Sequence, residues 1–183
     1  MSVNELARPA LSLNLPLDGH ASDGEPRYWS LRQLLRSPPP WRVGGLDVFV
    51  CESPNLLAMA ADALGLRCAP LLCTEGMPAA AQRALLAQLA AAGAHLHYHG
   101  DFDWPGIAIG NRVLQDFGTR PWRFSAVDYA VAVRLAAPGH ALRGSPVAAG
   151  WDSSLAGVMQ QAQRAIAEEA LLTELLPDLA GAA

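Results

Sequence analysis

Apolar positions along this chain alternate between short continuous runs and segments of helical periodicity. Three apolar runs have the length and composition of strands: residues 46–51, 68–73 and 95–99. A segment with helical periodicity follows each run: residues 54–64, 78–92 and 107–117. Nearly continuous apolar runs are typical of parallel strands covered on both faces. The alternation predicts an α/β fold, a doubly wound, mainly parallel sheet flanked by helices.

Several residues mark where the predicted helices begin and end. Ser53 followed by Pro54 is a strong helix start, because serine caps the amino end and proline fits the first helical position. Gly93 is a natural C-cap of the second helix. Ser125 predicts a cap for residues 126–135. A helical region is expected after Ser153, and its last part, residues 165–179, has apolar side chains on one face.

The first 44 residues do not follow this pattern. Residues 10–15 have the pattern of a short strand, and Ser30 can cap a short helix. We interpret residues 1–44 as an arm, or as the tail of an upstream domain, followed by one domain over residues 45–183. The alternative is an ordinary irregular layer packed on the core of that domain.

Composition excludes some classes of function and indicates the cellular location. The net charge of −4 is unlike that of a basic nucleic-acid-binding domain, and all thirteen basic residues are arginine, so no lysine is available for a Schiff base or a P-loop. No apolar run is long enough to span a bilayer, and the amino end does not resemble a secretory signal. We expect a cytoplasmic protein with no membrane contact, whose three cysteines are buried thiols.

Three carboxylates mark the candidate site. Glu52 follows the first predicted strand, and Asp101 and Asp103 follow the third. Parallel strands end at one edge of the sheet, so these acids converge there if the two strands are neighbours. Three acids in one cleft suit Mg²⁺, which can stabilise in-line displacement at phosphorus. The alternatives are a helix-capping acid at Glu52 and a turn stabilised by the aspartates.

Other residues near these strands have weaker signals. Three are candidates for contact with substrate: His99, Arg112 and Glu75. The alternating histidines 95, 97 and 99 share one face of a strand, which can simply pack against a helix or a partner. Glu168 and Glu169 have the pattern of a solvated helix face, with completion of a metal shell as the alternative.

The motif of residues 100–106, Gly-Asp-Phe-Asp-Trp-Pro-Gly, together with the strand that ends at Glu52, resembles the Toprim domain. Toprim is the fold of topoisomerase catalytic modules, primases and related nucleases, and the form here is similar to that in type IIB topoisomerase A subunits. The sequences of three segments, residues 51–54, 72–76 and 98–106, also resemble those of bacterial proteins with a C-terminal DUF2399 domain. Those proteins are similar to the Toprim nuclease subunit of Wadjet-type plasmid-defence systems. The resemblance spans about residues 7–179.

This resemblance implies a metal-dependent DNA endonuclease. Glu52 would bind the metal and act as a general acid or base, while Asp101 and Asp103 would hold Mg²⁺ or Mn²⁺. The three tyrosines lack the winged-helix context in which topoisomerases place their nucleophile, so water is the expected nucleophile. The implied partners are DNA and subunits of a condensin-like SMC complex, with a homodimer as a further option. We expect weak DNA binding in isolation, because the DNA-binding half found upstream in such proteins is missing.

Two other functions were weighed against the nuclease. One is a non-catalytic Toprim-fold module that docks on an SMC-type complex, and the intact set of three acids favours the nuclease over it. The other is a nucleotide-binding phosphotransfer domain. It lacks support, because Glu52, Ser53 and Pro54 occupy the turn where a glycine-rich phosphate loop would lie.

Overall fold

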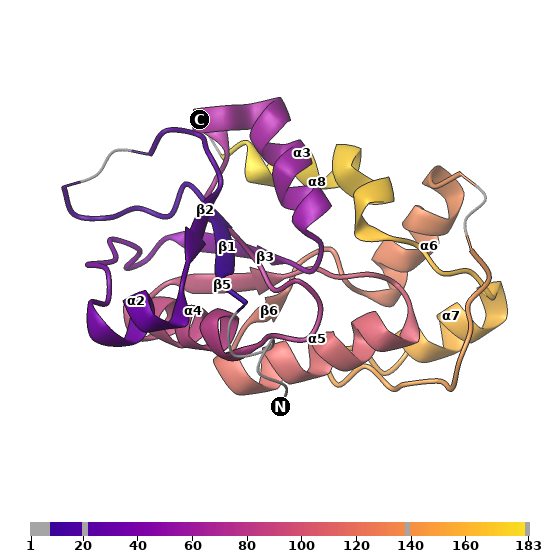
Figure 1. The fold of residues 1–183 in the computed structure, drawn as a ribbon. Coiled ribbons are helices and arrows are strands. Elements are labelled where there is room, and N and C mark those ends of the chain that lie inside the picture. The colour runs from indigo at the N-terminus through magenta and orange to yellow at the C-terminus, as the bar shows by residue number, and fades with distance from the viewer. Residues whose placement is uncertain (1–7, 20–21, 138–139, 182–183) are drawn as a thin grey trace.

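A single six-stranded sheet forms the centre of the protein (Figure 1). The computed structural model describes residues 8–19, 22–137 and 140–181. The strands are β1 (Ala10–Leu13), β2 (Arg27–Trp29), β3 (Asp47–Cys51), β4 (Leu71–Cys73), β5 (His95–Tyr98) and β6 (Arg120–Pro121), in the order β2-β1-β4-β3-β5-β6. Strands β4, β3, β5 and β6 are parallel, and β1 is antiparallel to both its neighbours. The predicted mainly parallel α/β sheet is confirmed.

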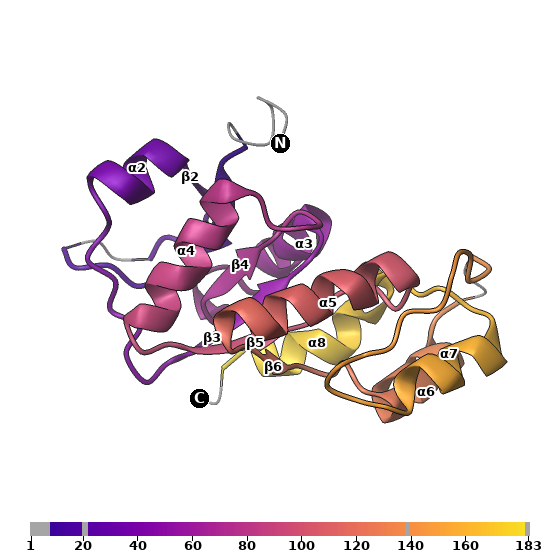
Figure 2. The same cartoon turned by 90° about the horizontal axis from the view of Figure 1, so that it is seen from below.

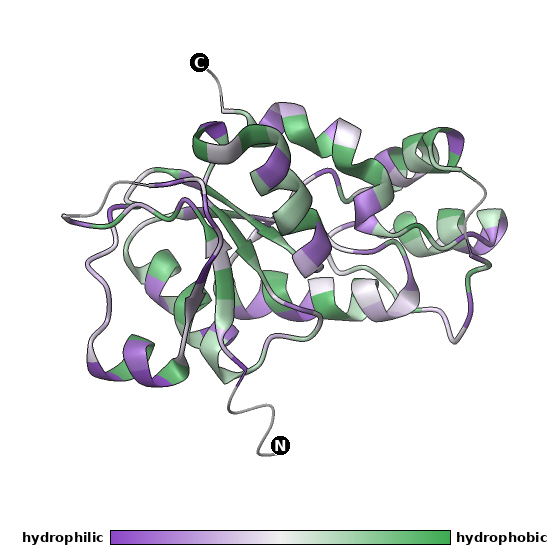
Figure 3. Ribbon diagram, turned by 45° about the horizontal axis from the view of Figure 1, so that its top comes forward, coloured by the Kyte–Doolittle hydropathy of each residue, from purple (hydrophilic) through white to green (hydrophobic). Residues whose placement is uncertain are grey.

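Helices cover both faces of the sheet. They are α2 (Leu31–Arg36), α3 (Pro54–Leu64), α4 (Ala80–Ala91), α5 (Trp104–Phe117), α6 (Ala126–Leu135), α7 (Leu155–Ala162) and α8 (Leu172–Leu179), with 3₁₀ turns η1 (Gly65–Arg67) and η2 (Glu168–Leu171). Figures 1 and 2 show α3 and α8 on one face and α4 and α5 on the other. Helices α6 and α7 pack together beyond β6. In Figure 3 the strands are largely hydrophobic, because helices bury them on both sides.

The predicted helix caps at Ser53, Ser125 and Ser30 agree with the structure, whereas α5 begins at Trp104 and not at the predicted residue 107. Ser53 caps α3 by accepting a hydrogen bond from the N–H of Asn55 at 3.2 Å, and Pro54 is the first helical residue. Ser125 and Asp128 form a capping box at the start of α6, and Ser30 forms one at the start of α2. These caps satisfy backbone N–H groups that have no partner within the helix.

The segment before β3 is part of the same sheet. Strand β1 lies between β2 and β4, and the indole N–H of Trp29 donates to Ser12 Oγ at 2.9 Å. The side chain of Gln88 in α4 donates to the carbonyl oxygen of Leu34 in α2 at 2.8 Å. The described residues up to 44 therefore form a layer of the domain, which was the alternative interpretation, and the division at residue 44 does not follow a break in the sheet.

The carboxyl-terminal region differs from the expected continuous helix over 165–179. The chain is extended at Ile166, which exchanges two backbone hydrogen bonds with Phe102, at 2.9 and 3.2 Å. Helical structure begins only at η2. The expectation was wrong here because pairing with the loop after β5 satisfies the backbone of Ile166 without a helix. This pairing brings the residues that follow Ile166 to the ends of β3 and β5.

Candidate functional site

Glu52 and Asp101 lie at the same edge of the sheet. Strands β3 and β5 are neighbours and parallel, with Val50 opposite Tyr98, so both chains leave the sheet on the same side. The N–H of Asp101 donates to Glu52 Oε2 at 3.3 Å. The predicted common edge is confirmed, and the condition for convergence is met because the two strands are neighbours.

Two glycines permit the close approach of the chains at this edge. A Cβ atom on Gly100 would lie 2.9 Å from Glu52 Oε2, and one on Gly106 would lie 2.2 Å from the carbonyl oxygen of Asp101. Contacts this short are repulsive, and at Gly106 the contacting atom is backbone. The spacing of glycines and aspartates in the motif therefore has a steric reason, because a side chain at either position would push the acids apart.

Replacing Gly106 with alanine is expected to destabilise the fold by about 2–3 kcal/mol, because the overlap with Asp101 can be relieved only by moving backbone. Gly157→Ala in α7 is the matched control, since a Cβ there meets nothing within 4 Å. Alanine at that helical position should be neutral or stabilise by up to about 1 kcal/mol. Urea unfolding of both variants measures the difference, and equal stabilities would contradict the steric account.

Asp103 has a structural task at this edge. It is the N-cap of α5, and its Oδ1 accepts a hydrogen bond from the N–H of Gly106 at 2.7 Å. This is the turn-stabilising role that was weighed against metal binding. The carboxylate still lies close enough to Glu52 and Asp101 to raise the pKa of both by repulsion.

Glu168 joins the acids at the centre of the site, contrary to the expected solvated face. Its fully buried carboxylate accepts hydrogen bonds from the N–H groups of Glu52, at 3.1 Å, and Ser53. Its own N–H donates to Asp101 Oδ1 at 2.8 Å. One residue thus holds the turn after β3 and orients the acid after β5. Its contact with Glu52 spans 116 positions of sequence, so no local pattern indicated it.

Glu169 adds a further carboxylate beside Glu168. Ser53 Oγ donates to Glu169 Oε1, and the side chain of Asn55 reaches the same oxygen at 3.5 Å. The negative charge of Glu169 contributes to the raised pKa values of Glu52 and Asp101. The site is therefore more acidic than the three predicted residues alone would make it.

Burial and mutual repulsion disfavour the charged forms of these acids. Burial, followed by repulsion from Asp101, raises the pKa of Glu52 to about 7. The pKa of Asp101 rises to about 6, chiefly through burial and then through repulsion from Asp103, against the lowering effect of the Glu168 N–H. Burial raises the pKa of Glu168 well above its ordinary value. Within the described ranges, no ion pair joins any of these acids to a cationic side chain.

The acids are not arranged as a complete set of metal ligands. Across residues 8–19, 22–137 and 140–181, no three His, Cys, Asp or Glu side chains converge as a group that could hold an ion. Two of the carboxylates instead accept backbone N–H groups, Asp103 at α5 and Glu168 at the turn after β3. The assignment of Glu52, Asp101 and Asp103 to a metal stays a prediction.

Comparison with known protein families places this site in context. Residues 27–179 match a family described as the C-terminus of a protein of unknown function, DUF2399. The chain belongs to the DUF2399 family. The matched range starts with β2 and ends with α8, so Glu52, Asp101 and Glu168 all lie inside the DUF2399 domain. No curated protein matches the chain.

In the part that the structure describes, no helix is long and apolar enough to cross a membrane.

The raised pKa values predict how the stability of the metal-free DUF2399 domain depends on pH. Because Glu52 and Asp101 have higher pKa values in the folded protein than their ordinary 4.5 and 3.8, the folded state binds more protons. The stabilisation is full below about pH 4 and is lost as pH rises to about 7, on the order of 3 kcal/mol for each acid. Urea unfolding in chelator across this range should show the decline, and Glu52→Gln should flatten its upper part. A stability that rises over this interval in both proteins would contradict the prediction.

The three predicted substrate contacts have partners away from the acids. Glu75 contacts Arg8 and Gln82, and Arg112 forms an ion pair with Asp116 at 2.9 Å. His99 is fully buried, and its Nδ1 lies 2.9 Å from the carbonyl oxygen of Trp122. Burial lowers the pKa of His99 to about 4, which keeps the ring neutral at pH 7. The side chains of these three residues are therefore bound to groups other than the acids, and their contact with substrate stays a prediction.

Proposed function

We propose that this DUF2399 domain is the nuclease module of a DNA-cleaving assembly and hydrolyses phosphodiester bonds with Mg²⁺ or Mn²⁺. The observation that carries the proposal is the pair Glu52 and Asp101, partly buried at the carboxyl edge of adjacent parallel strands without a cationic partner among the described residues. Ligand sites of open α/β sheets lie at this edge. The Toprim-like motif of residues 100–106 supports the same reading.

The chemistry of the acids fits a hard divalent cation. Carboxylate oxygens are the ligands that Mg²⁺ prefers, and Mg²⁺ commonly takes only one or two from the protein and keeps several waters. Glu52 and Asp101 would hold the ion, with Asp103 and Glu169 adding negative charge nearby. A bound divalent ion supplies charge stabilisation for in-line displacement at phosphorus. It would also remove the repulsion that raises the pKa values of both acids.

Water is the proposed nucleophile. Tyr98 is fully buried, and the hydroxyl of the buried Tyr129 donates to the carbonyl oxygen of Arg164 at 2.7 Å. The exposed Tyr28 lies on β2, at the opposite side of the sheet order from β3 and β5. Held in its ionised form beside the bound ion, Glu52 could accept the proton of the attacking water as a general base. The phosphorus–oxygen bond to the leaving nucleotide then breaks.

The proposed setting is an SMC-associated complex in plasmid defence. A net charge of −4 opposes the approach of DNA to the isolated chain, and Arg112, a predicted substrate contact, is paired with Asp116. Binding to DNA alone should therefore be weak and salt-dependent. Partner subunits would supply the basic surface that positions DNA at the acidic edge.

A second candidate is a non-catalytic Toprim-fold module that docks on the SMC-type complex. One observation favours it: within the described ranges no three acidic or histidine side chains converge as a metal-binding group. In that case the acids would serve the fold, as Asp103 does at α5 and Glu168 does after β3.

Nicking of supercoiled plasmid separates the two candidates. The chain, alone and with its SMC partners, is incubated with Mg²⁺, with Mn²⁺ or with chelator. The nuclease predicts nicked or linear product only with a divalent ion, and more of it when the partners are present. No ion-dependent product under either condition would leave the docking module as the function.

Metal binding also has a stability signature. Excess Mn²⁺ should raise the free energy of unfolding of the parent, by about 2.7 kcal/mol when the ion is at 100 times its dissociation constant, because only the folded site binds it. Asp101→Asn should lose most of that gain, while in chelator it should be as stable as the parent or more so. Thermal melts with chelator and with excess Mn²⁺ measure both effects. A parent whose melting temperature ignores Mn²⁺ would refute the metal site.

A further inference from the structure

The imidazole ring of His99 has one nitrogen without a hydrogen-bond partner, and the ring lines a cavity between α6 and the segment of η2 and α8. The ring is fully buried against Phe102, Trp122 and Phe124. Its Nδ1 faces the carbonyl oxygen of Trp122 at 2.9 Å, so Nδ1 carries the proton and Nε2 carries the lone pair of the neutral ring. No described residue donates a hydrogen bond to this buried Nε2. A buried acceptor without a donor is costly, which suggests that a bound group supplies one.

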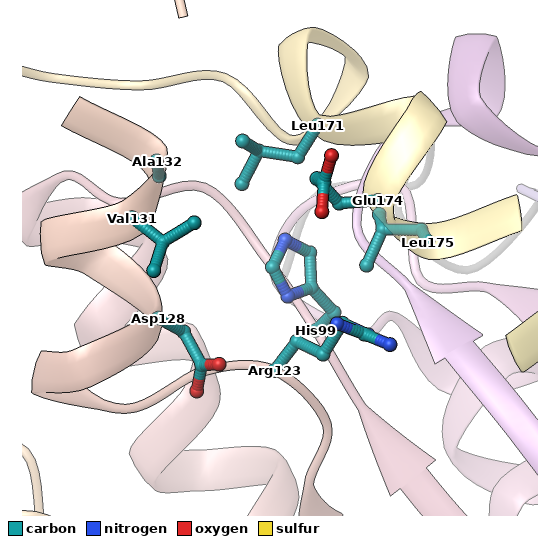
Figure 4. A pocket seen from close by; sticks show the side chains of 8 residues that line it. All are labelled: His99, Arg123, Asp128, Val131, Ala132, Leu171, Glu174 and Leu175. Carbon is teal, nitrogen blue, oxygen red and sulfur yellow. The ribbon is translucent and has the colours of Figure 1, made fainter. Parts of the chain in front are cut away.

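Figure 4 shows the ring of His99 at the centre of this cavity, between α6 and the segment of η2 and α8. The cavity has a volume of about 80 Å³. Its walls include the apolar side chains of Leu171 and Leu175, together with residues of α6. This volume holds roughly five water-sized groups. A small group with an apolar stem and one or more N–H donors therefore fits both the size and the walls.

The charges around the cavity favour a cation. Arg123 lines it but is bound to Asp178 through two hydrogen bonds, at 2.5 and 2.9 Å. Asp128 and Glu174 also line the cavity, and among the described residues neither has an ion-pair partner. One guanidinium against these three carboxylates leaves an excess of two negative charges. An anion would be repelled, and a neutral ligand would leave this excess uncompensated.

We propose that this cavity binds an alkylammonium group, with His99 Nε2 and the carboxylates of Asp128 and Glu174 accepting its N–H donors. The group can come from a small free amine or from a lysine side chain of a partner protein. This chain contains no lysine, so a second copy cannot supply it. The proposal does not depend on nuclease activity, because none of these residues belongs to the acid site at Glu52 and Asp101.

Titration of the full chain with three probes of equal size tests the proposal, with the side-chain ¹⁵N signal of His99 as the readout. Propylammonium should shift the Nε2 signal in a saturable way, propanol should bind several-fold more weakly, and propionate should not bind. Glu174→Gln should weaken propylammonium binding about tenfold, since a charged acceptor is replaced by a neutral one. Glu25→Gln, which changes the same charge in an exposed loop, should leave it unchanged.

The outcomes separate the sources of the ligand and can overturn the site. A short peptide with one lysine that binds more tightly than propylammonium indicates a partner's side chain, whereas weaker binding indicates a free amine. The same peptide with its lysine acetylated should not bind. No shift with any amine, or equal shifts with all three probes, would overturn the alkylammonium site. Glu174→Gln is the deciding variant, because it leaves the contact between His99 and the carbonyl oxygen of Trp122 intact.

Discussion

Replacing Glu52 with glutamine is expected to lower Mg²⁺-dependent plasmid nicking by about 10²–10⁴-fold, the usual contribution of a general base. Glutamine keeps the size of the side chain but can neither accept the proton of water nor contribute negative charge to an ion. Because bound Mg²⁺ favours the ionised carboxylate and lowers the pKa of Glu52 from its metal-free value of about 7, the nicking rate of the parent should rise with pH and level off below pH 7. Initial rates across pH, in excess Mg²⁺, measure both effects.

Stability data keep this result from being confused with unfolding. Glutamine at position 52 removes a charge that burial and Asp101 disfavour, so the metal-free variant should be as stable as the parent or more so. Glu25→Gln is the matched control for charge, since Glu25 is exposed in the loop before β2. A Glu52→Gln protein that nicks plasmid as fast as the control would show that Glu52 has no part in cleavage.

Truncating Glu168 to alanine is expected to destabilise the protein by about 3–4 kcal/mol. The change leaves the buried N–H groups of Glu52 and Ser53 without acceptors and opens a cavity beneath the turn. Glu168→Gln keeps the volume and one acceptor oxygen, so it should cost about half as much. Urea unfolding near pH 7 gives both values.

The neighbouring acid provides the control for Glu168. Glu169 is partly exposed, and its side chain accepts from Ser53 Oγ rather than from backbone. Glu169→Ala should therefore cost only about 1 kcal/mol. If Glu168→Ala is no more harmful than Glu169→Ala, then Glu168 does not hold the turn after β3, and its contacts are incidental.

Helix starts and the character of the sheet could be predicted because their causes are local. The caps at Ser53 and Ser125 involve backbone groups two or three residues away, and such bonds form wherever the chain places them. Continuous apolar strands followed by periodic helices leave few arrangements other than a covered parallel sheet. The sequence likewise put Glu52 and Asp101 at strand ends, and therefore at one edge.

Whether those two acids meet depended on strand order, which the sequence did not settle. They come together because β3 and β5 are neighbours, and this order results from packing of the whole sheet. The same holds for residues 8–44, where β1 pairs with β4 and β2 pairs with β1. The strand at residues 10–15 was expected, but no local pattern said which strand it would pair with.

The position of Glu168 could not be predicted from local patterns either, because long-range packing also determines it. Its pattern near the end of the chain is that of an exposed helix, yet pairing of Ile166 with Phe102 holds it against the turns after β3 and β5. In place of water, its carboxylate then accepts hydrogen bonds from the backbone N–H groups of Glu52 and Ser53, which lie more than a hundred residues away along the chain. By itself the sequence determined which side chains are acidic and where strands end. Tertiary structure alone decided which acids share a site, because their contacts join segments distant along the chain.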